Sequence, residues 1–279
     1  MYIKSRFEIF INILFYIGLG VALIIAIYPF FTIILMSLRP RVLSFTLPPV
    51  YIFKPTLSHF RDTFLWHSGL IRNLWNSIII SSSTTLIAVI TGTLAAYAFS
   101  RINFKAKDFL FQWILTFRML PAISVVLPFF IMFTKLGIYD TLLAVIVTHV
   151  IIDLPMAIWL MKSFIDELPE ELDEAARIDG CSRMGAFWRI CMPLSAPALV
   201  ATAILCFLFS WNEYLFAVCL TSTKARPILI ATQGLMSYQG MRWGQLAVLC
   251  IIIIIPAILV VLFFQRYLIR GLTFGAVKA

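Results

Sequence analysis

Charged side chains are scarce in this sequence of 279 residues: Asp, Glu, Lys and Arg make up 13% of it, about half the share in a typical soluble domain. Hydrophobic residues make up 62%, and the mean hydropathy is +0.98. A soluble fold of this size has too little interior to bury so much apolar surface. The composition therefore excludes a soluble domain, and it also excludes a disordered chain, collagen and a secreted disulfide scaffold.

Residues typical of metal and nucleotide sites are also few. The five cysteines include no C-x-x-C pair, and the three histidines are scattered along the chain. We therefore expect no metal site. The phosphate-binding pattern G-x-x-x-x-G-K-[ST] does not occur: Gly180 and Gly185 have its spacing, but Ala186 and Phe187 follow where lysine and a hydroxyl are needed. The sequence predicts a non-catalytic chain with no cofactor of its own.

The net charge of +9 would suggest a nucleic-acid partner in a soluble protein. Here the basic residues stand mostly between long apolar runs, where they set membrane topology or contact anionic lipid headgroups. No basic stripe with interleaved aromatic residues is present, so we expect membrane lipid and no nucleic acid as a partner.

Six apolar runs are long enough to cross a bilayer, and in lipid such runs must be helical. The chain is therefore predicted to be an all-α, polytopic integral membrane protein that forms one domain. Its expected spans cover residues 9–38, 76–99, 109–133, 142–161, 196–220 and 246–264, and the third is expected to be broken by Pro121 and Pro128.

An even number of spans places both termini on one side. More lysines and arginines lie on that side, which includes the 162–195 loop, than on the side of the 39–75 and 221–245 loops. By the positive-inside rule the termini are predicted to be cytoplasmic and the other two loops to lie outside.

The 162–195 loop carries strong helix signals. Acidic residues crowd the positions after Pro169, Gly180 stands where a helix would end, and Ser182 can cap a second short helix that closes at Pro193. The loop has seven acidic and four basic side chains, whereas helices that rest on anionic lipid are usually basic. We therefore expect this helical hairpin to dock in a groove of another protein.

Residues of this loop resemble a known family pattern. Glu174-Ala175-Ala176, then Gly180, then Ile190-Cys191-Met192-Pro193 resembles the EAA loop of ABC-importer permeases, with Met192 where leucine is usual. Three other stretches are similar to the smaller permease subunit of maltose-type importers, the carbohydrate branch of the family: 73–77, 211–217 and the tail from 265 to 278.

The resemblance implies a type I ABC-importer permease fold with a cytoplasmic coupling helix, in a bacterial or archaeal cell (inner) membrane. It implies a heterodimer with a second permease subunit, a dimeric ABC ATPase that binds ATP and Mg, an extracytoplasmic solute-binding protein and a sugar substrate. The residues implied in coupling to the ATPase are Glu174, Ala175, Ala176, Arg177, Asp179, Gly180, Ile190 and Pro193.

Several polar residues fall within or beside the apolar runs, where an ionisable side chain usually faces protein or water. We expect Arg118 to pair with a carboxylate and His149 to make a buried hydrogen bond. Asp153, Asn212 and Glu213 are candidates for lining a solute path. For the ionisable residues the alternative is that they pair across helices or snorkel, and for Glu213 a structural role at the subunit interface is at least an equal alternative.

Two other readings of function stay open. Permeases for glycerol phosphate, amino acids or other small solutes share the EAA loop, and only the sugar-like stretches argue against them. A secondary transporter would usually show internal repeats and ion-coupling carboxylates, and neither is evident in the sequence.

Overall fold

The computed structural model describes residues 6–44, 46, 48, 50–66, 69–237 and 240–273. Helices make up most of the described chain, and two very short strands, β1 (Met236–Ser237) and β2 (Gly240–Met241), pair as an antiparallel hairpin. The predicted all-α class is therefore confirmed. The chain divides into two compact units, Met1–Ser68 with Thr232–Ile254, and Gly69–Ala231 with Ile255–Ala279, and each is described by itself.

The first unit contains α1 (Arg6–Leu38), the 3₁₀ turn η1 (Arg41–Leu43), α2 (Ser58–Trp66), the β-hairpin and the start of α12 (Trp243–Thr273). From Ile11 onward α1 is apolar on all sides and almost wholly exposed, as expected of a helix that contacts lipid or a partner. His59 on α2 is buried, its Nε2 lies 2.8 Å from the carbonyl oxygen of Arg39, and Gly244 packs against its ring.

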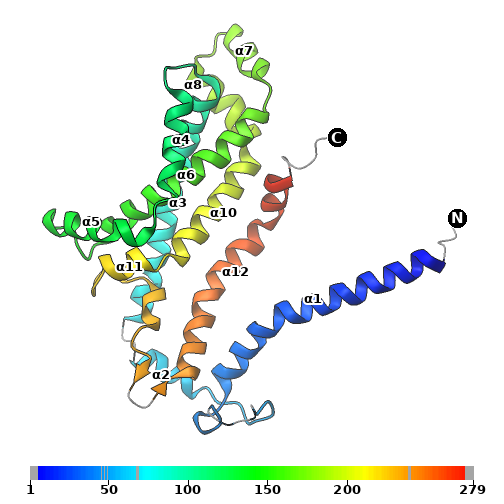
Figure 1. The fold of residues 1–279 in the computed structure, drawn as a ribbon, viewed down its shortest axis with the longest axis vertical. Coiled ribbons are helices and arrows are strands. Elements are labelled where there is room, and N and C mark those ends of the chain that lie inside the picture. Colours follow the sequence, from blue (N-terminus) through cyan, green and yellow to red (C-terminus); the bar gives the residue numbers. More distant parts are fainter. Residues whose placement is uncertain are drawn as a thin grey trace. The chain divides into compact units, whose positions relative to one another are not determined.

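The second unit is built around α3 (Leu70–Arg101), α6 (Leu142–Glu167) and α10 (Ala196–Asn212), which pack side by side (Figure 1). Its core consists of small and medium apolar residues on these helices, among them Ala88, Ala157 and Cys206. An added Cβ at Gly92 would lie 2.8 Å from the Cβ of Ala157, so the glycine allows α3 and α6 to approach closely.

The segment between α6 and α10 forms four short helical pieces at one end of this bundle, at the top of Figure 1. They are α7 (Glu170–Ile178), α8 (Arg183–Ala186), the π-helical turn η2 (Phe187–Cys191) and α9 (Met192–Leu194). The predicted 162–195 loop is therefore an extension of α6 followed by a helical hairpin. A short helix, α11 (Leu215–Leu220), and the 3₁₀ turn η3 (Ile228–Thr232) follow α10.

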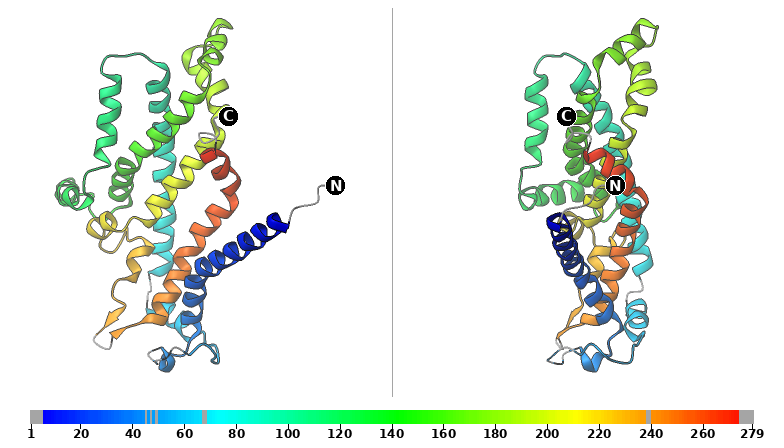
Figure 2. Two further views of the ribbon diagram at one scale, coloured as in Figure 1. Left: turned by 45° about the vertical axis from the view of Figure 1, so that its right-hand side comes forward. Right: turned by 90° about the vertical axis from the view of Figure 1, so that its right-hand side faces the viewer.

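The expected third span, 109–133, is broken at Pro121 as predicted, but the break predicted at Pro128 does not occur. It consists of α4 (Lys107–Phe117) and α5 (Ala122–Lys135), whose axes differ by 89° (Figure 2). Tight turns at Arg118 and Met119 end α4, and Pro121 has no N–H with which to continue it. The other prolines inside long helices, such as Pro128 and Pro155, do not interrupt them.

Four described helices are long and apolar enough to span a membrane, and the number rises to six if two bent pairs each count as one span. The long helices are α1, α3, α6 and α12, and the bent pairs are α4 with α5 and the hairpin's second half with α10. The expected fifth span, 196–220, is interrupted where α10 ends at Asn212 and α11 begins at Leu215. The single-domain organisation and the exact spans stay predictions.

Candidate coupling segment and intramembrane polar groups

The α7 helix begins and ends as its sequence indicates. Glu170, Glu171 and Asp173 occupy its first turn, where negative side chains are favoured by the helix dipole. At the other end Gly180 has φ +88°, its amide donates to the carbonyl of Arg177 and the amide of Cys181 donates to that of Ala176. These two bonds form a Schellman motif, which reverses the chain into α8.

The second half of the hairpin is capped and anchored. The hydroxyl of Ser182 accepts a hydrogen bond from the amide of Gly185, as predicted for an N-cap. Phe187 is buried against Tyr97 of α3, with ring centroids 5.0 Å apart. Cys191 lies in the same buried cluster.

Large apolar side chains on the hairpin nevertheless point outward. Ile178 is 86% exposed, and Leu172, Met184 and Trp188 are exposed as well. The acidic Glu174, four residues before Ile178 and so on the same face of α7, is also exposed. An exposed large apolar side chain with a charged neighbour, carried on a short helix, is typical of a protein-docking surface, and Ile178 and Glu174 are the docking surface referred to below.

Arg101, the last residue of α3, holds the start of α7. Its Nε donates to Oδ2 of Asp173 at 2.7 Å, its Nη2 donates to the carbonyl oxygen of Leu168 at 2.6 Å, and its Nη1 lies 3.7 Å from Oε1 of Glu170. The side chains of Arg101 and Asp173 are 8% and 11% exposed. A largely buried guanidinium with three acceptors on one short segment fixes the orientation of α7 relative to α3.

A second polar cluster joins α6 to the break after α10. His149 is buried, with Nδ1 2.8 Å from Oγ of Ser210 and Nε2 3.2 Å from Oε2 of Glu213. Glu213 also accepts hydrogen bonds from the amides of Phe216 and Ala217, so it caps the start of α11. The expected buried hydrogen bond of His149 is confirmed.

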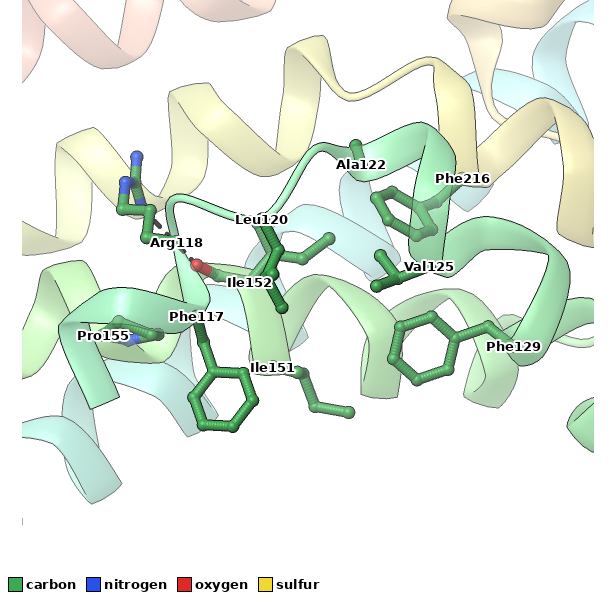
Figure 3. Close-up of a pocket in the computed structure, with 10 residues that line it drawn as sticks. All are labelled: Phe117, Arg118, Leu120, Ala122, Val125, Phe129, Ile151, Ile152, Pro155 and Phe216. Carbon is green, nitrogen blue, oxygen red and sulfur yellow. Dashed lines mark hydrogen bonds between the residues drawn. The ribbon is translucent and has the colours of Figure 1, made fainter. Parts of the chain in front are cut away.

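Arg118 lies at the elbow between α4 and α5, beside a cavity of about 410 Å³ (Figure 3). The rings of Phe117, Phe129 and Phe216 line this cavity. The expectation that Arg118 pairs with a carboxylate is wrong for the described part of the chain. Its guanidinium donates instead to the carbonyl oxygen of Ile152 at 3.4 Å and lies over the ring of Phe209.

At the opposite end of the bundle from the hairpin, residues 222–228 are held by side chains of α3 and of the turn before α6. Nδ2 of Asn76 donates to the carbonyls of Lys224 and Arg226, and Oγ of Ser77 accepts the amide of Ile228. Asp140, in a left-handed conformation with φ +57°, accepts hydrogen bonds from the four amides of 222–225. The resemblance stretch 73–77 therefore fixes this loop.

Comparison with known proteins identifies the chain. Residues 88–274 match the model of the family described as binding-protein-dependent transport system inner membrane component. The chain belongs to this family. It is 37% identical to the trehalose/maltose transport system permease protein MalG of Thermococcus litoralis, covering 98% of this chain and 99% of that one. It is 40% identical to the trehalose transport system permease protein SugB of Mycobacterium tuberculosis, covering 91% and 93%.

Solved structures give the same fold. A component of a bacterial ABC transporter involved in the import of alginate matches with a TM-score of 0.76 at 21% identity, covering 96% of this chain and 99% of that one. The predicted type I ABC-importer permease fold is confirmed, as is the resemblance to the carbohydrate branch. The chain is a multi-pass membrane permease.

The structure of the permease divides the eight residues expected to couple to an ATPase. Ala176 is buried and Ile190 is partly buried, so both act from within the hairpin. The other six are exposed, namely Glu174, Ala175, Arg177, Asp179, Gly180 and Pro193. Their role in coupling stays a prediction.

The three residues suggested for a solute path have different surroundings in the permease. Asp153 is 2% exposed, and its Oδ2 has no hydrogen-bond partner among the described residues. Asn212 is exposed, and among the described residues its side chain donates only to the carbonyl of Leu208 on its own helix. Glu213 serves as the cap described above, so its contacts explain a structural role. Their contact with solute stays a prediction.

Sequence reasoning missed Arg101 and Asp140. Arg101 is separated from Asp173 by 72 residues, and Asp140 from the loop it binds by more than 80. Each residue has a feature in the sequence that could have drawn attention to it. Arg101 is a basic residue at the end of a long apolar run in a chain with an acidic loop. Asp140 follows Gly137 in a turn. Neither feature indicates which residue is the hydrogen-bond partner.

Proposed function

We propose that this permease is one half of the translocation path of an ATP-driven sugar importer. It pairs with a second, different permease subunit and docks a dimeric ABC ATPase through the hairpin of α7 and α8. An extracytoplasmic binding protein delivers the solute. The permease is non-catalytic, because ATP and Mg are bound and hydrolysis occurs in the ATPase.

The observation that carries this proposal is the docking surface on the hairpin, with Ile178 86% exposed beside acidic Glu174. A groove on the ATPase that closes when ATP binds would displace α7. The spans joined to α7 would then tilt and open the path on the other side of the membrane. This requires the hairpin and both termini to be cytoplasmic.

A sugar is supported by the names of relatives that align over nearly the whole chain, which transport trehalose, maltose and arabinooligosaccharides. The first test is a thermal-shift screen of the cognate binding protein against trehalose, maltose, arabinooligosaccharides, glycerol 3-phosphate and amino acids. Stabilisation by a sugar supports the proposal. Stabilisation only by glycerol phosphate or an amino acid would assign the importer to another solute.

The second test concerns the partners and the orientation. The tagged permease should copurify with an ATPase and a second permease, and substitution of Ile178 by Asp should abolish ATPase binding while the two permeases stay together. A cysteine at exposed Asp179, in a background without native cysteines, should react with an impermeant maleimide only in inside-out vesicles. Labelling in intact cells would refute a cytoplasmic hairpin.

A further inference from the structure

The end of α3 contacts both halves of the hairpin. Arg101 in the last turn binds Asp173 of α7 and the carbonyl oxygen of Leu168, which precedes α7. One turn earlier, the ring of Tyr97 packs on Phe187, and its hydroxyl lies 3.4 Å from the carbonyl oxygen of Arg183. Because 97 and 101 are four residues apart, they project from the same face of α3.

These contacts matter because the chain itself joins the hairpin only to α6 and α10. Between α6 and α7 stand Leu168 and Pro169, both extended, with ψ of 131° and 129°. Two extended residues make a joint at which a short helix can pivot. Arg101 donates to the carbonyl of Leu168 within this joint and to the carboxylate of Asp173 beyond it. One side chain of α3 therefore connects the two sides of the joint.

We infer that Arg101 is a positioning residue that makes α3 move with the coupling hairpin. The inference rests on the proposed function, because it supposes that an ATPase displaces α7. When α7 is displaced, α6 moves with it because the backbone joins them. The helix α3 moves with it because Arg101 is bonded to Asp173. Since α3 packs along both α6 and α10, the three helices then tilt as one body.

The geometry predicts a graded response to substitution. Arg101→Lys keeps one donor group, which reaches either Asp173 or the Leu168 carbonyl but not both in the present geometry. Arg101→Ala removes both bonds, and Asp173→Asn keeps the acceptor oxygen but removes its charge. Lys105→Ala is the matched control: it removes a neighbouring positive charge whose side chain is exposed.

The test uses the intact complex of permeases and ATPase in proteoliposomes, together with the binding protein. The sugar is the one that the thermal-shift screen of the binding protein identifies, and trehalose and maltose are the first probes. If Arg101 carries a coupling free energy of the usual size, which changes an equilibrium constant by about fivefold or more, sugar transported per ATP hydrolysed should fall by about that factor in Arg101→Ala. It should fall less in Asp173→Asn and Arg101→Lys, and it should not change in Lys105→Ala.

A second readout measures the joint itself. Spin labels at exposed Thr91 on α3 and exposed Glu171 on α7 report the distance between the two helices. The distribution should be narrow in the wild type and in Lys105→Ala, and broad in Arg101→Ala. This measurement needs only the permease pair. If the wild type binds no ATPase, the proposed function fails while the distance data still test the contact.

Two results would overturn the inference. The first is transport per ATP within about twofold of the wild type in Arg101→Ala, whatever the distance distribution shows. The second is a distance distribution in Arg101→Ala that is unchanged from the wild type. Should Arg101→Ala fail to assemble, Asp173→Asn and Arg101→Lys decide by the same criteria, because both keep a polar group at the site.

Discussion

His149 and Glu213 form a hydrogen-bonded pair, 3.2 Å between Nε2 and Oε2, at the break between α10 and α11. The other imidazole nitrogen is 2.8 Å from the hydroxyl of Ser210, so one buried ring contacts residues just before and at the break. The carboxylate then caps α11 through the amides of Phe216 and Ala217. The break in the fifth apolar run is therefore stabilised by its own polar residues.

Substitution of Glu213 by Ala should lower the stability of the permease. It removes the cap of α11, which typically costs about 0.5–2 kcal/mol, and it leaves a buried imidazole nitrogen unpaired, which adds roughly 1–3 kcal/mol. Thermal unfolding in detergent measures the effect. Asn212→Ala is the control, because this exposed side chain bonds only within α10. Equal midpoints for the two variants would contradict the prediction.

Gly180 should be required for both the turn and the coupling. Its φ of +88° is strained for any residue with a Cβ, by about 1–2 kcal/mol, although no atom would obstruct an added Cβ. Gly137 is a matched control with φ +70° and equally open space, at the other end of the bundle. Gly180→Ala and Gly137→Ala should lower the free energy of unfolding by similar amounts. Of these two variants, only Gly180→Ala should lower the sugar transported per ATP hydrolysed. Gly180→Leu should lower this ratio further. Normal coupling in an assembled Gly180→Leu complex would refute the role of this turn.

Local signals explain why the hairpin could be predicted from the sequence. An acidic first turn, a glycine at the helix end and a serine cap each act within a few residues, and each occurs where expected, at Glu170, Gly180 and Ser182. The elbow at Pro121 could not be located in this way. Pro128 lies in the same apolar run, and α5 continues through it, so proline alone does not determine the bend.

Contacts between residues distant in the sequence could not be predicted, for a different reason. Arg101 has several carboxylates available in the acidic loop, and only the folded chain shows that Asp173 faces inward while Glu174 faces outward. Arg118 was expected to find a carboxylate for the same electrostatic reason, yet it contacts a carbonyl and an aromatic ring. The charge of a side chain indicates that it needs a polar or aromatic partner. Which residue becomes that partner depends on how the helices pack.

Gly92 should tolerate no side chain beside Ala157. An added Cβ would lie 2.8 Å from the Cβ of Ala157 and 3.3 Å from the backbone nitrogen of Ile158, so α3 and α6 would have to separate. Gly92→Ala should cost about 1–3 kcal/mol, the usual range for an overpacked core. Ala157→Gly in the same chain should restore part of this loss, measured by thermal unfolding in detergent. The absence of any rescue would show that the contact is not the cause.

Asp140 should make the stability of residues 222–225 depend on pH in the acidic range. Burial alone would raise the pKa of this carboxyl, but the backbone amides of 222–225 donate to its charged form and lower the pKa from 3.8 to about 2. A group whose pKa is lower in the folded state stabilises fully above its unfolded value and loses that contribution as the pH falls. The contribution of Asp140 should therefore be complete at pH 5 and decline between about 4 and 2.

Asp140→Asn provides the measurement of this effect. The neutral amide keeps the size of the side chain and one acceptor, so the variant should be less stable than the wild type at pH 5, and the difference between them should shrink toward pH 2.5. Thermal unfolding midpoints of the two proteins at these pH values give the comparison, and other carboxyl groups cancel because both proteins carry them. A constant difference across this range would mean that the charge of Asp140 contributes nothing to holding the loop.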